Sequence, residues 1–234
     1  MEKQKFLDLI KGQLIVSCQA LEDEPLHGSS YMAKMSLAAK MGGAVAIRAN
    51  GKEDIIAIRN ATGLPTIGIV KRDYPDSDIF ITPTLKEVSE LIEAGTDVIT
   101  LDATLRERPG GTSFQEMVCF IRENCSSLIM ADVSTIEEGI AAVAEGCDLI
   151  STTLSGYTPY SPQIDEPDFD LIKKLASRCH VPVIAEGRIS TPDEAIEAFK
   201  NGAHSVVVGT AITRPQVLTK RFVEKMKRVE IKSS

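Results

Sequence analysis

Residues 135–152 read TIEEGIAAVAEGCDLIST and contain the start of a helix, its end and a strand. Thr135 and Glu138 have capping-box spacing, in which each side chain accepts a hydrogen bond from a backbone N–H that the helix start leaves free. Gly146, eight residues after Glu138, can adopt the left-handed conformation that ends many helices. The apolar run at 149–152 has the length of a buried strand. This segment therefore predicts a helix, a tight turn and a strand, in that order.

The same spacing occurs at two other places in the chain. The residues that repeat it are Thr84 with Glu87 and Gly95, and Thr191 with Glu194 and Gly202. A short apolar run follows each glycine, as it follows Gly146. Helix, turn and strand repeated along a chain are typical of α/β proteins with a parallel sheet.

Eight apolar runs have the length of a strand. They lie at 14–17, 44–47, 66–70, 98–101, 128–131, 149–152, 182–185 and 205–209. Such nearly continuous apolar strands suit a sheet that is covered on both faces. Seven of the intervals between them can hold a crossover helix, and 215–227 can form the eighth. A further run at 79–82 is expected to extend the loop after the third strand.

We therefore predict an α/β fold of the (β/α)8 TIM-barrel type, with an open doubly wound sheet as the alternative. The length of 234 residues suits one such barrel, which typically has about 250. No linker or change in composition suggests a second domain, so we expect one domain over residues 1–234. A short helix at about 3–11 is expected before the first strand.

Charge and composition exclude several classes of function. The 26 Lys and Arg against 33 Asp and Glu leave a net charge of −7, which argues against a nucleic-acid or anionic-membrane surface. No apolar run approaches the roughly 20 residues of a membrane span. The five cysteines are odd in number and lack C-x-x-C spacing, as expected for reduced thiols in the cytoplasm. The three histidines are dispersed, so we expect no metal site.

In barrels of this type the active site lies at the carboxyl ends of the strands. The residues at which the predicted strands give way to loops are Gln19, Arg48, Lys71, Asp102, Asp132, Thr153, Glu186 and Gly209-Thr210. Almost all are polar. Lys71 near other cations can lose its proton near neutral pH and act as a base or an imine-forming nucleophile. Alternatively, Lys71 only pairs with Asp102 or Asp132.

Two glycine-containing turns predict a phosphate site. Gly187 and Arg188 follow the seventh predicted strand, and Gly209 and Thr210 follow the eighth. Barrels of this fold commonly bind phosphate at these two turns, where backbone N–H groups are free. Arg188 adds a permanent positive charge and a two-pronged donor. The alternative is that the glycines only permit tight turns.

Several segments, taken in order, resemble the N-acetylmannosamine-6-phosphate 2-epimerase family of bacterial sialic-acid catabolism. They are Cys18-Gln19-Ala20, 43–49 (GAVAIRA), 68–72 (GIVKR), 81–84 (ITPT), 101–104 (LDAT), 131–135 (ADVST), 152–158 (TTLSGYT) and 185–188 (AEGR). The resemblance runs from about Gln13 to Pro215. It implies interconversion of N-acetylmannosamine 6-phosphate and N-acetylglucosamine 6-phosphate, an N-acylglucosamine-6-phosphate 2-epimerase activity that needs no cofactor.

By this resemblance, a proton is removed from C2 of the open-chain sugar, next to the C1 aldehyde, and is returned from the other face. Lys71, Glu186 and Asp132 are the predicted catalytic residues: Lys71 would transfer the proton, with Glu186 aligning or assisting it and Asp132 helping to position the sugar. Glu186 and Asp132 could also supply the complementary acid, or could only orient Lys71. Arg48 suits the stabilisation of negative charge on oxygen. The other predicted substrate contacts are Gln19, Thr153 and Tyr157, with Gly187, Arg188, Gly209 and Thr210 for the phosphate.

Two other functions remain open at this point. An aldolase-like enzyme would use Lys71 as a Schiff-base nucleophile on a phosphorylated carbonyl substrate. A phosphosugar-sensing barrel that binds RNA or a regulator would keep the phosphate site without catalysis. We expect the partners to be the phosphorylated N-acetyl amino sugar and a second copy of the chain in a homodimer, with no nucleic acid and no membrane. The proline-containing segment at 156–167 is a candidate to close over the sugar.

Overall fold

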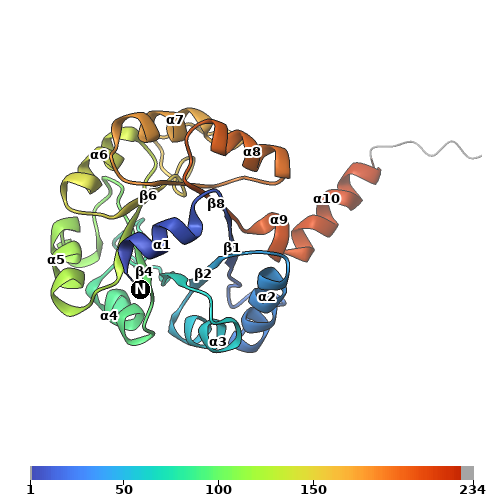
Figure 1. The fold of residues 1–234 in the computed structure, drawn as a ribbon, viewed down its shortest axis with the longest axis horizontal. Helices are drawn as coiled ribbons and strands as arrows, with labels where there is room; N and C mark the ends of the chain where they lie inside the picture. The colour runs from blue at the N-terminus through green and yellow to red at the C-terminus, as the bar shows by residue number, and fades with distance from the viewer. Residues whose placement is uncertain (1, 228–234) are drawn as a thin grey trace, which may run out of the picture.

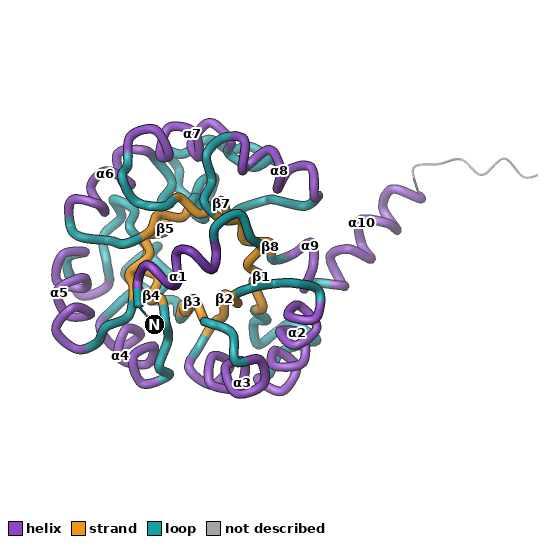
Figure 2. Tube along the Cα trace, in the orientation of Figure 1, coloured by secondary structure: helices purple, strands orange, loops and turns teal. Residues whose placement is uncertain are grey.

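The computed structural model describes residues 2–227 and confirms the predicted barrel. Eight parallel strands form a closed ring in chain order, inside a ring of helices (Figure 2). The strands are β1 Leu14–Cys18, β2 Ala46–Asn50, β3 Thr66–Ile69, β4 Val98–Asp102, β5 Leu128–Asp132, β6 Leu149–Ser151, β7 Val183–Glu186 and β8 Ser205–Val208. Closure pairs β8 with β1, so the sheet has no open edge.

The helices alternate with the strands. They are α1 Lys3–Ile10, α2 Ser29–Met41, α3 Lys52–Thr62, α4 Leu85–Glu93, α5 Phe114–Asn124, α6 Ile136–Ala144, α7 Phe169–Arg178, α8 Pro192–Lys200, α9 Thr210–Thr213 and α10 Pro215–Lys227, with a 3₁₀ turn, η1, at Pro109–Gly111. All three predicted capping boxes are present, and Ser113 with Glu116 forms another. Gly95, Gly146 and Gly202 have φ of 69°, 94° and 97°, the left-handed conformation expected after a helix.

The predicted limits of the second strand are wrong by two residues at its start and three at its end, whereas those of the other strands are wrong by one residue at one or both ends. The second, predicted at 44–47, begins at Ala46 and continues through Arg48 to Asn50. The predicted strand ended before Arg48 because only apolar residues were counted. Arg48 can nevertheless be buried in the strand because it pairs with acidic residues inside the barrel. The third strand ends at Ile69, and the segment at 79–82 then pairs antiparallel with Lys71 through Ile81.

The helix at 215–227 forms with the predicted bounds, but it does not cover its own barrel. None of the residues of α10 is buried, and the helix extends away from the rest of the molecule (Figure 1). Arg214, between α9 and α10, has φ −119° and ψ 78°, which interrupts the helical path before Pro215. Phe222 and Met226 remain 71% and 68% exposed.

The inside of the barrel is apolar at one end and polar at the other. An inner cluster that includes Ile15, Ile67 and Ile184 packs against Phe6 and Ile10 of α1, which closes the amino-terminal end. A second apolar cluster fills the space between the strands and the surrounding helices. Polar side chains are therefore left to the carboxyl-terminal end. Among residues 2–227, no helix combines the length and apolar character that a membrane crossing requires.

Candidate active site

A cavity of about 430 Å³ opens at the carboxyl-terminal end of the barrel and contains nearly all of the predicted site residues. Those in its lining are Gln19, Arg48, Lys71, Thr153, Tyr157, Glu186, Gly187, Arg188, Gly209 and Thr210. Asp132 is fully buried, and it reaches this group only through hydrogen bonds. Asp102, which ends β4, is also fully buried; it pairs with Arg106 instead of lining the cavity.

Arg48 forms the centre of a buried ion cluster. Its side chain is 1% exposed and donates two hydrogen bonds to Asp132, from Nη2 to Oδ2 at 2.5 Å and from Nη1 to Oδ1 at 3.1 Å. Nη1 also donates to Thr153 and to Oε2 of Glu186. Burial opposes the charge of Arg48, but Asp132 and Glu186 outweigh it and raise its pKa. Arg48 therefore holds both carboxylates in fixed positions.

Glu186 has a raised pKa in this cluster. Burial of the carboxyl group is the largest cause, and the negative charge of Asp132 acts in the same direction, while Arg48 opposes both. Thr153 donates to Oδ1 of Asp132 at 2.9 Å and to Oε2 of Glu186 at 3.2 Å. No donor within residues 2–227 bonds to Oε1 of Glu186. This oxygen is the one available to a substrate or to Lys71.

Lys71 lies just beyond β3 and lines the same cavity. Burial lowers its pKa to about 8, with further lowering by Arg48 and Arg214; Glu186 and Glu24 oppose this shift. A lysine in such surroundings is partly neutral near physiological pH, and a neutral amine can accept a proton. The cavity thus contains both an amine that can be neutral near physiological pH and a carboxyl group that retains its proton more readily than usual.

Gln19 and Tyr157 lie at different depths. Gln19 is 9% exposed and donates from Nε2 to Ser17 Oγ at 2.9 Å. Tyr157, in the loop between β6 and α7, is 59% exposed at the cavity edge. Gln19 therefore faces the cavity floor, whereas Tyr157 is at its entrance.

The two predicted phosphate-binding turns are adjacent, because β7 pairs with β8. The backbone N–H groups of Gly187, Arg188, Gly209 and Thr210 donate to no other group in the described part of the chain. Gly187 has φ 115°, and a Cβ at Gly209 would approach Ser17 Cβ to 3.3 Å. Gly187 therefore adopts a conformation that favours glycine, and the space beside Gly209 is tight for a larger residue.

The side chain of Arg188 is engaged by the loop between β6 and α7. Its Nε donates to the carbonyl of Glu166 at 2.7 Å, and its Nη1 donates to the carbonyl of Ser155 at 2.8 Å. Arg188 itself has φ 59°, in the left-handed region. Two of its donors therefore tie the two ends of this loop together, and the predicted phosphate contact stays a prediction.

Arg214 and Arg221 also line the cavity, although they were absent from the predicted site. Arg214 pairs through Nε with Oε1 of Glu24 at 3.1 Å, which connects the loop after β1 to the end of α9. The available signal was a cation four residues after Thr210. It was missed because only the first residues after each strand were considered.

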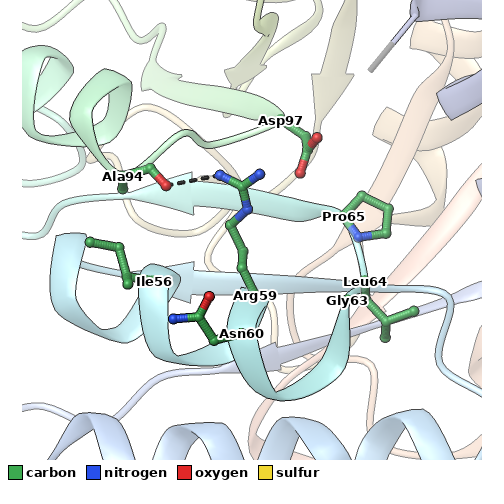
Figure 3. A pocket seen from close by; sticks show the side chains of 8 residues that line it. All are labelled: Ile56, Arg59, Asn60, Gly63, Leu64, Pro65, Ala94 and Asp97. Atoms are coloured by element: carbon green, nitrogen blue, oxygen red, sulfur yellow. Dashed lines mark hydrogen bonds between the residues drawn. The ribbon is translucent and has the colours of Figure 1, made fainter.

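Figure 3 shows another pocket, at the opposite end of the strands, where Pro65 precedes β3 and Asp97 precedes β4. Arg59 of α3 donates there to the carbonyl of Ala94 at 2.9 Å and also to that of Gly95. Arg59 thus satisfies carbonyls at the end of α4. No predicted site residue lines this pocket.

Comparison with known proteins identifies the chain's relatives. The NanE family model, described as "Putative N-acetylmannosamine-6-phosphate epimerase", matches residues 32–228. Two relatives are named "Putative N-acetylmannosamine-6-phosphate 2-epimerase". The one from Clostridioides difficile (strain 630) is 55% identical over 93% of this chain and 97% of that protein. The one from Clostridium perfringens (strain SM101) is 56% identical over 94% of this chain and 100% of that protein.

Solved structures agree with the sequence comparisons. The N-acetylmannosamine-6-phosphate 2-epimerase from Clostridium perfringens has a TM-score of 0.92 and 55% identity, covering 94% of this chain and 96% of that one. Thiamine phosphate pyrophosphorylase from Pyrococcus furiosus, with a TM-score of 0.62 at 18% identity, shares the fold alone. The chain belongs to the N-acetylmannosamine-6-phosphate epimerase family.

Proposed function

We propose that this chain interconverts N-acetylmannosamine 6-phosphate and N-acetylglucosamine 6-phosphate, the N-acylglucosamine-6-phosphate 2-epimerase reaction of sialic-acid catabolism. The observation that carries the proposal is Lys71, an amine with a pKa of about 8 in a cavity that also contains Glu186. Roughly a tenth of such a group is neutral at pH 7. Family membership supports the choice of substrate.

The reaction requires the removal of one proton from C2 and the return of one proton to C2. In the open-chain sugar, the C1 aldehyde makes the C2 hydrogen acidic. The neutral amine of Lys71 takes this proton, and the electrons of the C2–H bond form an enolate over C1 and C2. Return of a proton to the opposite face of C2 gives the epimer. Either the Lys71 ammonium or a protonated Glu186 supplies it.

The remaining members of the ion cluster act on this pair. Asp132 is fully buried, so we assign it the role of holding Arg48 and Thr153 instead of touching the sugar. Arg48 in turn donates a hydrogen bond to Oε2 of Glu186. Oε1 of Glu186 would then be free to act on the substrate. The positive charge of Arg48 also favours negative charge on the substrate oxygens. Gln19, Thr153 and Tyr157 would contact the sugar from the lining of the cavity.

The phosphate would bind at the turns after β7 and β8. Four unpaired backbone N–H groups, those of Gly187, Arg188, Gly209 and Thr210, support this assignment. The charges of Arg188 and Arg214 lie at the same cavity. Phosphate held there would orient C2 toward Lys71, so binding energy from a remote group would contribute to the reaction.

The assembly and location belong to the same proposal. We expect a homodimer, because α10 leaves Phe222, Val223 and Met226 exposed and a second copy of the chain can cover them. We expect the chain to act in the cytoplasm, and the five free cysteines support a reducing compartment.

Proton NMR of N-acetylmannosamine 6-phosphate with the enzyme in deuterated water tests the proposal. The expected product is N-acetylglucosamine 6-phosphate with deuterium at C2. Lys71→Ala should show neither exchange nor epimerisation, because positioned acid–base catalysis contributes about 10² to 10⁴-fold and the proposal gives the reaction no other initiating base. The variant should still bind sugar phosphate. Normal C2 exchange in Lys71→Ala would exclude Lys71 as the base. Trapping of a covalent adduct by borohydride would favour the Schiff-base alternative.

A further inference from the structure

The backbone on either side of Lys71 is held by groups that do not belong to the parallel sheet. The Val70 N–H donates to Thr82 Oγ1 at 3.3 Å, and the Lys71 N–H donates to Asn50 Oδ1 at 2.7 Å. The Arg72 N–H donates to the Phe80 carbonyl at 3.0 Å. The backbone N–H groups of three consecutive residues, 70–72, therefore bond outside the backbone ladder of β2, β3 and β4, at the point where the cavity begins.

The side chain of Asn50 accepts the hydrogen bond that the next backbone carbonyl of β2 would otherwise accept. It is the last residue of β2, and its backbone is in register with Ile69. Gly51 then donates to the Ile69 carbonyl at 2.8 Å and, at φ 88°, turns the chain into α3. The β2 backbone therefore ends before it can offer a carbonyl to Lys71. The Asn50 amide oxygen takes that place.

Thr82 holds the other side of the same segment in an uncommon conformation. It is fully buried and has φ 46°, although a β-branched side chain disfavours positive φ. Its N–H donates to the Val70 carbonyl at 2.8 Å, while its hydroxyl accepts from the Val70 N–H. Buried Arg108 donates to the carbonyls of Thr82 and Pro83. Strained residues persist only where such contacts impose their conformation.

We propose that Asn50 and Thr82 are positioning residues that hold the Lys71 backbone so that its amine enters the cavity. Neither residue lines the cavity, so neither needs to touch the substrate. Lys71 lies outside every strand, so these two side chains and the antiparallel bridge to Ile81 hold its backbone in place of the parallel ladder. The inference rests on the proposed role of Lys71 as the base.

Asn50→Ala tests the first contact. Loss of the acceptor should let the Lys71 backbone shift, and a shift of about 1 Å can reduce a reaction rate by about a hundredfold. We expect kcat and the rate of C2 exchange to fall together by about ten- to a hundredfold, with KM changed less than about twofold. Asn60→Ala, at the opposite end of the barrel, is the matched control and should behave as wild type.

Asn50→Asp provides a readout that a purely structural role would not change. The carboxylate keeps an oxygen acceptor for the Lys71 N–H and adds a negative charge at the Lys71 backbone, which favours the protonated amine and so raises the pKa of Lys71. The activity of Asn50→Asp should therefore exceed that of Asn50→Ala and should need higher pH than the wild type. Equal activity of the two variants at every pH would overturn the role of Asn50.

Thr82→Ser and Thr82→Val form a second matched pair, which also serves if Asn50→Ala fails to fold. Serine keeps the hydroxyl acceptor, whereas valine keeps the shape and leaves the Val70 N–H unpaired. We expect near wild-type kcat for Thr82→Ser and about a tenfold lower kcat for Thr82→Val, with similar KM. Wild-type kcat in folded Asn50→Ala and Thr82→Val would refute the proposal. If Lys71→Ala abolishes C2 exchange at the same time, the base assignment stands and only the positioning role fails.

Discussion

Lys71 must be neutral to accept the C2 proton, and its surroundings bring that state close to neutral pH. Burial, Arg48 and Arg214 lower its pKa from the ordinary 10.5 to about 8. Below the pKa the neutral fraction falls about tenfold per pH unit, so kcat/KM should decrease toward acid with a midpoint near pH 8. Initial rates from pH 5.5 to 9.5 measure this profile.

Arg214→Gln checks the cause of the shift at the same scale. Removing this cation and freeing Glu24 both favour the protonated amine, so the midpoint should move to higher pH. Weaker phosphate binding would change the height of the profile without moving its midpoint. A midpoint that stays in place, or moves toward acid, contradicts the electrostatic account of Lys71.

The guanidinium of Arg188 lies at the proposed phosphate site and also donates hydrogen bonds to both ends of the loop between β6 and α7. A charge-assisted hydrogen bond contributes about 1.5 to 3 kcal/mol. Arg188→Ala should therefore lower kcat/KM by roughly ten- to a hundredfold, mainly through KM. Steady-state kinetics measure the split between the two constants. An unchanged KM would remove Arg188 from the proposed phosphate site.

Gly156→Ala is the matched control for Arg188. A Cβ on Gly156 would lie 2.6 Å from Nη1 of Arg188, so it would disturb the loop while keeping the positive charge. If charge matters most, inorganic phosphate should inhibit Gly156→Ala nearly as well as wild type and Arg188→Ala less well. The reverse order would assign Arg188 to the loop alone.

Among the helices, α6 has a deeply buried capping box. Glu138 is fully buried and accepts from the backbone N–H groups of Ser134 and Thr135, from that of Leu105, and from the Tyr160 hydroxyl. Leaving a buried donor unpaired costs about 1 to 3 kcal/mol. Glu138→Ala should lower the free energy of unfolding by about 3 kcal/mol or more, measured by urea denaturation.

Glu116→Ala makes the corresponding change in the exposed capping box of α5. Water can replace the lost carboxylate there, so the loss of stability should be much smaller. Similar losses in the two variants would show that burial does not determine the strength of these caps.

At the scale of the whole molecule, the exposed apolar residues of α10 predict how the chain assembles. It exposes Phe222, Val223 and Met226 while the other barrel helices pack on their strands (Figure 1). We expect light scattering to give twice the 25.4 kDa mass of one chain. Phe222→Asp combined with Met226→Asp should give monomers, because charges are unfavourable in an apolar interface.

Ile140→Asp, on the exposed face of α6, is the control for this change and should leave the mass unaltered. A wild-type monomer, or a double variant that remains dimeric, would rule out α10 as the interface.

The repeated capping boxes and apolar runs were sufficient to predict the barrel, and nearly all of the residues predicted at the strand ends and turns line the cavity. The roles within the cavity were less accessible. Asp132 and Glu186 are both acids at strand ends and both pair with Arg48, yet only Glu186 lines the cavity and Asp132 is fully buried. Arg214 was missed because it lies beyond the turn after β8, between α9 and α10, where no local signal predicts the direction of the chain.

The sequence by itself determined where three of the helices, α4, α6 and α8, begin and end, the number of strands, and the chemical groups at the carboxyl ends of the strands. These properties depend on capping, turn conformation and apolar runs, which act over a few neighbouring residues. Only the tertiary structure decided which carboxylate is buried, how far the pKa of Lys71 falls, and that α10 leaves its own barrel. Each of these depends on charges and surfaces contributed by residues far apart in the chain, such as Arg48, Asp132 and Glu186, so the closed fold is needed to bring them together.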